Sequence, residues 1–283
     1  MAYIIDGNEA AKEVRRRVRA GVKAFEEKHG RRPGLSVILV GDNPASKVYV
    51  HNKQKACEKV GMEGKTYELP GSTGEEELIC LIDRLNRDES VDGILVQLPL
   101  PGHIDTQKVL LSILPEKDVD GFHPVNAGKM LQGKADLEPC TPRGCMELIR
   151  NTGIPLEGAR AVVIGRSNLV GKPMAILLQR EGCTVTLCHS KTKELAAYTR
   201  NADIVVCAVG RPGLLMGDML SPGCVVLDVG INRMEDGSLK GDVDFESASK
   251  VCAGITPVPG GVGPMTIAML LSNTLIAAEA RNA

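Results

Sequence analysis

Short apolar runs alternate with amphipathic segments along the chain, a pattern that predicts an α/β fold. Apolar residues recur at helical spacing over Asn8–His29, which indicates an amphipathic helix. The run Leu35–Val40 is expected to be a buried strand, and a helix is expected over Ser46–Val60. A second buried strand should begin at Gly93 and end at the prolines that precede Gly102.

The middle of the chain is less regular. We expect a strand near Thr66–Leu69 and a helix over about Gly74–Arg87. A turn at Lys117–Pro124 and the polar, glycine-containing segment up to Pro139 are typical of a domain junction. A new helix should then start with Thr141 as its N-cap and proline at its first position.

The second half carries five short apolar strands with glycine-bearing exits, which predict a small doubly wound sheet. A closing helix is expected from Met265 to about Ala280. The expected strands are Ala161–Ile164, Thr184–His189, Ile204–Gly210, Val225–Ile231 and Val251–Thr256.

The first of these strands ends at Gly165 and is followed by Arg166, Ser167 and a helix that begins at Gly171. Free backbone N–H groups at that helix N-terminus would face an anion, such as the pyrophosphate of a dinucleotide. The alternative is an ordinary turn, because Ser167 stands where the second glycine of G-x-G-x-x-G would be. No acidic residue ends the next strand, where Ser190 stands instead. With Arg166 in the turn, this favours the 2′-phosphate of NADP over NAD.

Two further stretches could bind a ligand. Tyr49 and Lys53 lie four residues apart, on one face of their predicted helix, and Gln97 lies near the carboxyl end of a predicted strand. The loop Pro257–Pro264 contains Pro259, Gly260 and Gly261, where backbone could approach a ligand closely. A stiff hinge explains that loop equally well.

Composition excludes several classes of protein. The 283 residues include 34 Lys and Arg against 35 Asp and Glu, and aromatic residues make up 2%. No charge excess favours nucleic acid or an anionic membrane, so we expect neither as a partner. The nine cysteines form no C-x-x-C pair, and no signal peptide or apolar stretch of membrane length is evident. A soluble, cytoplasmic protein with free thiols is expected. No two histidines have metal-ligand spacing, and we predict no metal.

Taken together, these stretches make the chain similar to the methylenetetrahydrofolate dehydrogenase/cyclohydrolase family, and specifically to its short bacterial bifunctional form. The resemblance covers essentially the whole length. The matching motifs are Tyr49–Lys55, Gln97–Pro101, Lys117–Gly121, Pro139–Pro142, Val163–Ser167 with Val170 and Gly171, Cys188–Ser190, and Thr256–Thr266.

The resemblance implies a two-step reaction. NADP⁺ would take hydride from 5,10-methylenetetrahydrofolate, and water would then open the methenyl cation to 10-formyltetrahydrofolate. The implied catalytic and folate-binding residues are the substrate lysine Lys53, the stacking Tyr49, the lysine-orienting Gln97 and the pterin-binding Asp120. The folate-contacting loop would include Pro259, Gly260 and Gly261. The implied NADP contacts are Gly165, Arg166, Ser167, Ser190 and Ile231.

The resemblance also implies two domains and a homodimer formed through the nucleotide domains. A three-layer α/β catalytic domain would comprise residues 1–120 and the returning C-terminal helix 264–283. A Rossmann-like NADP-binding domain would comprise residues 140–260, with the active cleft between the two.

Two questions stay open at this level: which aspartate binds the pterin, and whether Lys53 is neutral or charged. Asp118 competes with Asp120 for the pterin, and the residues alone do not separate them. A surface lysine has a pKa of about 10.4, so a half-neutral Lys53 at pH 7 costs about 4.6 kcal/mol, which burial could supply. A neutral Lys53 could act as a general base, whereas a charged one could only orient the substrate.

Rival functions have weaker support. Tyr49 and Lys53 also have the spacing of the catalytic pair of short-chain dehydrogenases, but there the pair follows the nucleotide turn instead of preceding it. An NADP sensor without activity would not need all four folate-site residues. A dehydrogenase that lacks cyclohydrolase activity is a further alternative.

Overall fold

The computed structural model describes residues 2–282, which form two compact units. One unit combines the chain up to Lys12 with Thr141–Thr266, and we call it the six-stranded unit. The other combines Glu13–Cys140 with the chain from Ile267 onward, and we call it the three-stranded unit. Each unit has its own sheet and its own apolar core.

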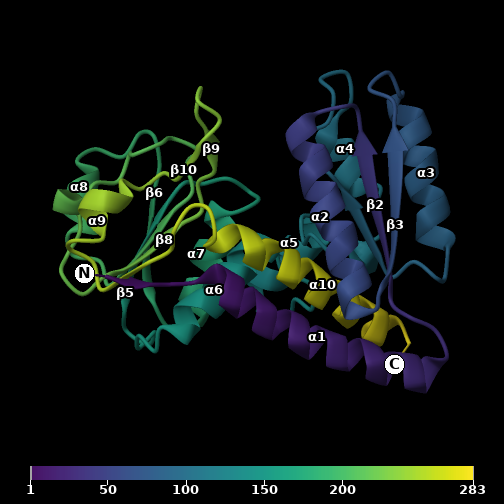
Figure 1. Ribbon diagram of the computed structural model, residues 1–283, viewed down its shortest axis with the longest axis horizontal. Helices are drawn as coiled ribbons and strands as arrows, with labels where there is room; N and C mark the ends of the chain where they lie inside the picture. The colour runs from purple at the N-terminus through teal and green to yellow at the C-terminus, as the bar shows by residue number, and fades with distance from the viewer. Residues whose placement is uncertain (1, 283) are drawn as a thin grey trace. The chain divides into compact units, whose positions relative to one another are not determined.

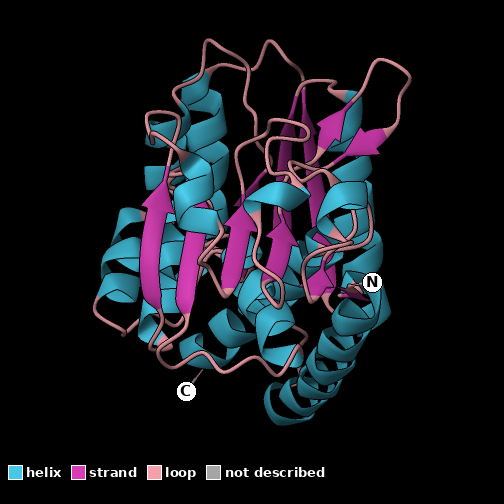
Figure 2. Ribbon diagram, turned by 90° about the vertical axis from the view of Figure 1, so that its left-hand side faces the viewer, coloured by secondary structure: helices cyan, strands magenta, loops and turns pink. Residues whose placement is uncertain are grey.

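All six strands of the larger sheet are parallel, in the order β1-β11-β8-β7-β5-β6 (Figure 2). The chain leaves β5 for β6 on one side and returns to β7 on the other, so the strand order reverses at β5. Such a switch point is where open α/β sheets bind ligands, beyond the carboxyl ends of the strands. The strands are β1 (Tyr3–Ile4), β5 (Arg160–Ile164), β6 (Thr184–Cys188), β7 (Ile204–Cys207), β8 (Val225–Asp228) and β11 (Gly254–Ile255).

Helices and a hairpin connect these strands. One face of the sheet carries a core that includes Val162, Ile164, Val205 and Val226, together with Ala248 of α9. Helix α7 contacts β5 and β6. The connecting elements are α6 (Cys140–Asn151), α7 (Gly171–Arg180), α8 (Leu195–Thr199), η2 (Gly217–Met219), α9 (Phe245–Ala248) and the antiparallel pair β9 (Asn232–Arg233) and β10 (Leu239–Lys240).

The three-stranded unit has three layers. Its parallel strands are β2 (Gly34–Val40), β3 (Glu63–Leu69) and β4 (Gly93–Val96), in the order β3-β2-β4. Helix α2 (Pro44–Val60) covers one face, and α3 (Glu75–Arg87) covers the other (Figure 1). The unit also contains α4 (Thr106–Leu111), η1 (Pro115–Lys117) and α5 (Pro124–Leu131).

Two long helices close this unit. Helix α1 (Gly7–His29) and the C-terminal helix α10 (Val262–Arg281) lie side by side (Figure 1). A Cβ built on Gly21 of α1 would lie 2.5 Å from Cδ2 of Leu275, so glycine permits the close approach. The C-terminal helix is also held through Asp92, which is fully buried and accepts hydrogen bonds from Arg31 and Arg281.

Several predicted boundaries differ from the structure. The strands predicted to reach Gly210 and Ile231 end at Cys207 and Asp228, because buried carboxylates take the N–H groups that follow. The strand predicted from Gly93 to the prolines stops at Val96. The strand expected from Val251 is only the two residues of β11.

Three other expectations are corrected. The predicted polar junction before Pro139 contains α5. Helix α6 starts at Cys140, so Thr141 lies within the helix and is not its N-cap. Residues Tyr3–Ile4, which were placed in the folate-binding domain with no strand predicted for them, form β1 and pair with β11 of the larger sheet. Two residues of parallel pairing are too short a signal to read from sequence.

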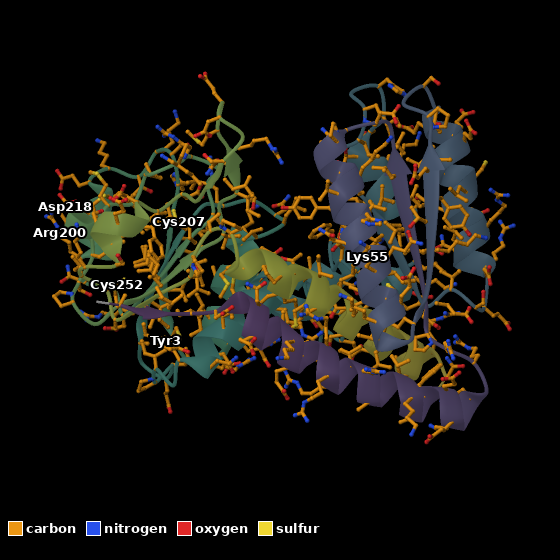
Figure 3. The ribbon with its side chains drawn as sticks, in the orientation of Figure 1. Tyr3, Lys55, Arg200, Cys207, Asp218 and Cys252 are labelled. Atoms are coloured by element: carbon orange, nitrogen blue, oxygen red, sulfur yellow. The ribbon has the colours of Figure 1, made fainter. Side chains whose placement is uncertain are left out.

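Cysteines and the apolar C-terminal helix form parts of the cores. All nine cysteines are free thiols and eight are buried, among them Cys207 and Cys252 (Figure 3). Burial raises the pKa of Cys57 and Cys145 to about 12, so these thiols behave as small apolar groups. Helix α10 is long and apolar enough to meet length and composition criteria for a membrane span, but 61% of its most apolar window is buried, as in a core helix.

Candidate functional site

A buried lysine on α2 is the centre of the candidate site in the three-stranded unit. Lys53 is only 7% exposed, whereas Lys55, two residues further along the same helix, is exposed (Figure 3). The Nζ of Lys53 donates a hydrogen bond of 2.9 Å to Oε1 of Gln97. The structure therefore brings together two of the predicted site residues.

Gln97 is held in one orientation. Its backbone N–H donates to the carbonyl of Ile38 on β2, at 2.8 Å, which places the residue just beyond the carboxyl end of β4. Its side-chain Nε2 donates to the carbonyl of Leu98, also at 2.8 Å. With the amide nitrogen engaged there, the amide oxygen is the atom left to face Lys53.

The charge of Asp120 acts on the same lysine. Burial lowers the pKa of Lys53, and the negative charge of Asp120 partly offsets that effect. Burial also raises the pKa of Asp120 to about 6, against the opposing influence of the Lys53 ammonium. The pKa values of both groups are therefore moved toward pH 7, which is typical of a site that transfers protons.

The structure separates the two candidate aspartates. Asp118 is buried, and its Oδ2 accepts hydrogen bonds from the N–H of His123 at 2.7 Å and from Asn126 at 2.9 Å. These bonds tie the loop to the start of α5 and give Asp118 a structural role. Asp120 is the aspartate whose charge acts on Lys53.

Three residues that were not predicted for the site hold the Asp120 loop in place. Asn273 of α10 donates to the carbonyls of Val119 and Glu138, both at 2.8 Å, and the thiol of Cys140 donates to Val119 at 3.2 Å. Lys117 is buried and donates to two carbonyls at the end of α3. Burial lowers the pKa of Lys117 to about 8. The sequence held a signal for each of them: Lys117 and Cys140 lie within matching motifs, and Asn273 is a polar residue in a predominantly apolar helix.

Tyr49 lies one turn before Lys53 on α2 and is 39% exposed. Its ring makes no contact with another aromatic ring among the described residues. A ring exposed to this extent can be reached by a planar ligand, as stacking requires.

The predicted dinucleotide turn in the six-stranded unit differs from expectation. The first N–H groups of α7 are already bonded: Gly171 donates to Oγ of Ser167 at 3.4 Å, and Lys172 donates to its carbonyl at 3.1 Å. The expectation that this helix start offers free donors is wrong, because Ser167 caps it. At this turn, the backbone N–H groups from Arg166 to Leu169 have no hydrogen-bond partner among the described residues.

The turn nevertheless has the packing that a close approach to phosphate needs. Gly165 has φ of +120°, and a Cβ on it would lie 2.2 Å from the carbonyl of Ala208. A Cβ on Gly171 would lie 1.9 Å from the carbonyl of Gly165. Both glycines are required for the compact strand–turn–helix, so the cofactor cradle fits this chain.

The other predicted NADP contacts lie at the same edge of the sheet. The register pairs Ile164 with Cys188, so the exposed Arg166 and Ser190 each follow the end of neighbouring strands by two residues. Ile231 follows the carboxyl end of β8, which is separated from β5 by β7, and is 46% exposed. A guanidinium and a hydroxyl in these positions suit a 2′-phosphate.

The Pro/Gly loop packs against the chain itself. The N–H of Gly7 donates to the carbonyl of Gly260 at 2.9 Å, and a Cβ on Gly7 would lie 1.7 Å from the carbonyl of Gly261. The backbone that lies close to these glycines is therefore the start of α1. The folate contacts predicted for Pro259, Gly260 and Gly261 stay a prediction.

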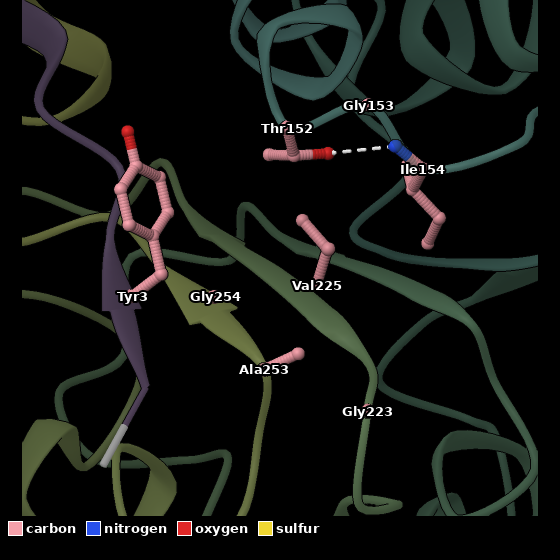
Figure 4. A pocket seen from close by; sticks show the side chains of 8 residues that line it. All are labelled: Tyr3, Thr152, Gly153, Ile154, Gly223, Val225, Ala253 and Gly254. Carbon is pink, nitrogen blue, oxygen red and sulfur yellow. Dashed lines mark hydrogen bonds between the residues drawn. The ribbon is translucent and has the colours of Figure 1, made fainter.

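A pocket of about 280 Å³ lies at the opposite edge of the six-stranded sheet, where the strands begin (Figure 4). Tyr3, Val225 and Gly254 line it, with Ile154 donating to Oγ1 of Thr152 at its side. Because ligands bind beyond the carboxyl ends of such strands, this pocket is not the cofactor site. Within residues 2–282, no three His, Cys, Asp or Glu side chains are grouped to hold a metal.

Comparison with known proteins also divides the chain into two parts, with the boundary between residues 120 and 139. A family described as "Tetrahydrofolate dehydrogenase/cyclohydrolase, catalytic domain" matches residues 5–120. The corresponding "NAD(P)-binding domain" matches residues 139–282. The "Bifunctional protein FolD" of Burkholderia pseudomallei is 59% identical over 98% of this chain and 97% of its own.

Solved structures agree with the sequence match. The bifunctional FolD enzyme of Campylobacter jejuni superimposes with a TM-score of 0.96 at 50% identity, covering 99% of this chain and 100% of its own. A Trypanosoma brucei enzyme, solved with NADP and an inhibitor, gives a TM-score of 0.95 at 42% identity, covering 99% and 98%. The chain therefore belongs to the tetrahydrofolate dehydrogenase/cyclohydrolase family.

Proposed function

We propose that this protein oxidises 5,10-methylenetetrahydrofolate with NADP⁺ and then hydrolyses the methenyl cation to 10-formyltetrahydrofolate. The observation that carries the proposal is the hydrogen bond between buried Lys53 and an oriented Gln97, beside Asp120, in the family's catalytic domain. Membership of the family excludes a short-chain dehydrogenase, and the presence of this charged, buried site argues against a sensor without activity.

In the first step, NADP⁺ accepts a hydride from the methylene carbon. The transfer needs no acid or base and depends on alignment alone. The exposed ring of Tyr49 stacks on the folate and fixes its plane, and the Asp120 carboxylate accepts two hydrogen bonds from the amino-pyrimidinone edge. Arg166 and Ser190 hold the 2′-phosphate of the cofactor.

In the second step, water adds to the methenyl carbon. The lowered pKa of Lys53 makes a neutral amine accessible, and its Nζ takes a proton as the water attacks. N5 then takes up the proton that Lys53 received, and the bond from that carbon to N5 breaks. The hydroxyl proton leaves to water as the C=O forms, and the carbon stays on N10 as the formyl group. Gln97 accepts one N–H of the amine and so points the lone pair of nitrogen away from itself.

A paired assay tests the proposal. The protein is mixed with 5,10-methylenetetrahydrofolate and either NADP⁺ or NAD⁺, and the absorbance of reduced cofactor and of methenyltetrahydrofolate is followed. We expect turnover with NADP⁺, and faster decay of added methenyltetrahydrofolate than in buffer. If no reduced cofactor forms, the protein binds these ligands without dehydrogenase activity. If methenyltetrahydrofolate decays no faster than in buffer, the protein is a dehydrogenase without cyclohydrolase activity.

We also propose a cytoplasmic homodimer that binds neither nucleic acid nor membranes. Nine free cysteines suit a reducing compartment, and the near-balanced charge gives no field for polyanions. Strand β6 is an unpaired sheet edge on which Leu187 is 36% exposed, a surface suited to contact between copies of the nucleotide domain. Light scattering during size-exclusion chromatography measures the dimer directly.

A further inference from the structure

Two buried carboxylates lie directly below the carboxyl edge of the six-stranded sheet. Asp228 is the last residue of β8 and is 4% exposed, and Asp242, which follows β10, is 0% exposed. Neither forms an ion pair with a described cation, and both accept backbone N–H groups instead. The proposed chemistry does not use either of them.

The carboxylate of Asp242 has all its acceptor positions filled. Its Oδ2 accepts N–H groups from Val209 at 2.6 Å and Gly210 at 2.9 Å. Its Oδ1 accepts from the N–H of Arg211 at 2.8 Å and from the side chain of Asn232 at 2.9 Å. A carboxylate can accept four such bonds, whereas an amide offers only one oxygen and would turn its own N–H₂ toward donors.

Asp228 fixes Asp242 in turn. Its Oδ1 accepts the N–H of Gly230 at 3.0 Å and that of Asp242 at 2.9 Å, and its Oδ2 accepts Val243 at 2.9 Å. Two glycines make room for the pair. A Cβ on Gly230 would lie 2.2 Å from the Asp242 carboxylate, and one on Gly241 would lie 1.8 Å from Oδ2 of Asp228.

The loops held in this way are those next to the proposed cofactor turn. Val209 follows the exit of β7, and its Cγ1 lies 3.6 Å from a Cβ built on Gly165. Ile231 stands between Gly230, which is bonded to Asp228, and Asn232, which is bonded to Asp242. The two carboxylates thus set the positions of the exit of β7, which is next to the turn that carries Arg166, and of the exit of β8, the next strand in the sheet.

We propose that Asp242 is a positioning residue for the cofactor: it holds the Val209–Arg211 loop and the Ile231 segment in the shape that binds NADP, without touching NADP itself. The inference rests on the proposed function, because it concerns the cofactor of that reaction. Since Asp242 organises backbone and not the 2′-phosphate, its loss should weaken NADP and NAD alike.

The test compares Asp242→Asn with the wild type and with Asp244→Asn, a control two residues away whose carboxylate caps the short helix α9. For Asp242→Asn we expect the KM for NADP⁺ and for NAD⁺ to rise about 10-fold or more, with kcat changed less than about 3-fold. Hydrolysis of methenyltetrahydrofolate, which consumes no cofactor, should stay at the wild-type rate. A purely structural defect would instead lower both activities together.

Asn232→Ala removes a single donor to Asp242 and should raise both KM values by a smaller factor. It decides the outcome if Asp242→Asn fails to fold. Unchanged cofactor KM values in a folded variant, or an equal loss of hydrolysis, would overturn the inference. A wild type that shows no reaction with either cofactor would instead refute the proposed function, so the two failures are distinguishable.

Discussion

The Nζ of Lys53 donates to Oε1 of Gln97 at 2.9 Å, although the two residues lie 44 positions apart in the chain. This contact joins the middle of α2 to the residue just after β4. Lys53 is buried, and its hydrogen-bond partner among the described residues is a neutral amide and not an anion. A neutral acceptor in this position leaves the pKa of the lysine low, which is what a general base near neutral pH needs.

Replacing Lys53 by methionine should remove the proton acceptor and keep the apolar volume. We expect Lys53→Met to lower methenyltetrahydrofolate hydrolysis by about 10²-fold or more, the usual contribution of general base catalysis. Some dehydrogenase activity should survive, because hydride transfer needs no base. The matched control is Lys59→Met, at the exposed end of the same helix, and both activities are measured for each variant. Retained hydrolysis in Lys53→Met would contradict the role of the lysine.

Replacing Gln97 by glutamate should give Lys53 a charged partner. An opposite charge at this distance raises the pKa of a lysine by about 1–3 units. We expect hydrolysis by Gln97→Glu to be slow at neutral pH and to recover as the pH is raised, so the rate profile shifts to higher pH. Gln97→Met lacks the charge and should lose orientation without that shift. Identical pH profiles for the two variants would show that charge is not the cause.

Asp120 should make folate binding depend on pH. Burial raises the pKa of Asp120 to about 6, so the carboxyl protonates as the pH falls through that value and can no longer accept two hydrogen bonds. We expect the KM for methylenetetrahydrofolate to rise below about pH 6, and Asp120→Asn should have a high KM that no longer varies with pH there. A pH-independent wild-type KM would rule this out.

The same shift has a defined sign for stability. The folded-state pKa of Asp120 lies above its ordinary value of 3.8, so the folded protein binds this proton more tightly than the unfolded chain. The contribution of this group to the free energy of unfolding therefore falls as the pH rises from about 4 to about 6. In Asp120→Asn that part of the pH dependence should be missing from urea unfolding curves.

Arg166 should decide between the two nicotinamide cofactors. Loss of its charge-assisted hydrogen bonds to a 2′-phosphate is expected to weaken NADP binding by about 1.5–3 kcal/mol. NAD, which lacks that phosphate, should bind Arg166→Leu as it binds the wild type. Arg180→Leu, at the far end of α7, controls for the change in net charge. Titration calorimetry with both cofactors measures the difference, and equal losses would refute the assignment.

Gly171 should be intolerant of a side chain. The Cβ of Gly171→Ala would lie 1.9 Å from the carbonyl of Gly165, and backbone cannot give way as a flexible side chain can. We expect the free energy of unfolding to fall by about 1–3 kcal/mol, because the clash outweighs the higher helix propensity of alanine. Gly128→Ala, in α5 with nothing within 4 Å of the new methyl, should instead gain about 0.5–1 kcal/mol. Similar unfolding curves for both variants would disprove the packing argument.

The long elements could be predicted because their patterns are local. The apolar spacing of Asn8–His29 predicted α1 to within one residue at its start, and Leu35–Val40 did the same for β2. Helix α5 was missed because its eight residues include an exposed glycine, Gly128, and so resemble a turn-rich linker. The strand ends were overestimated because the acceptors that stop β7 belong to Asp242, 31 to 33 positions further along the chain.

The residues of the candidate site could be predicted from the sequence, but their burial, hydrogen bonds and pKa shifts could not. Motif resemblance named Lys53, Gln97 and Asp120, whereas the residues alone left Asp118 as a competitor of Asp120 for the pterin. The bonds from His123 and Asn126 to Asp118 settle which carboxylate is structural. No pattern in the sequence could show that contact.

The sequence by itself determined the two α/β halves, the family and the identity of the chemical groups, because periodicity and motifs are properties of neighbouring residues. Tertiary structure decided which of those groups are buried, which are already bonded and which charges act on one another. Asn273 reaches Val119 across 154 positions, and Ser167 uses its hydroxyl to cap the helix that was expected to offer free donors. Burial and electrostatics depend on distance in space, and distance in space is set by packing between segments that are far apart in the chain.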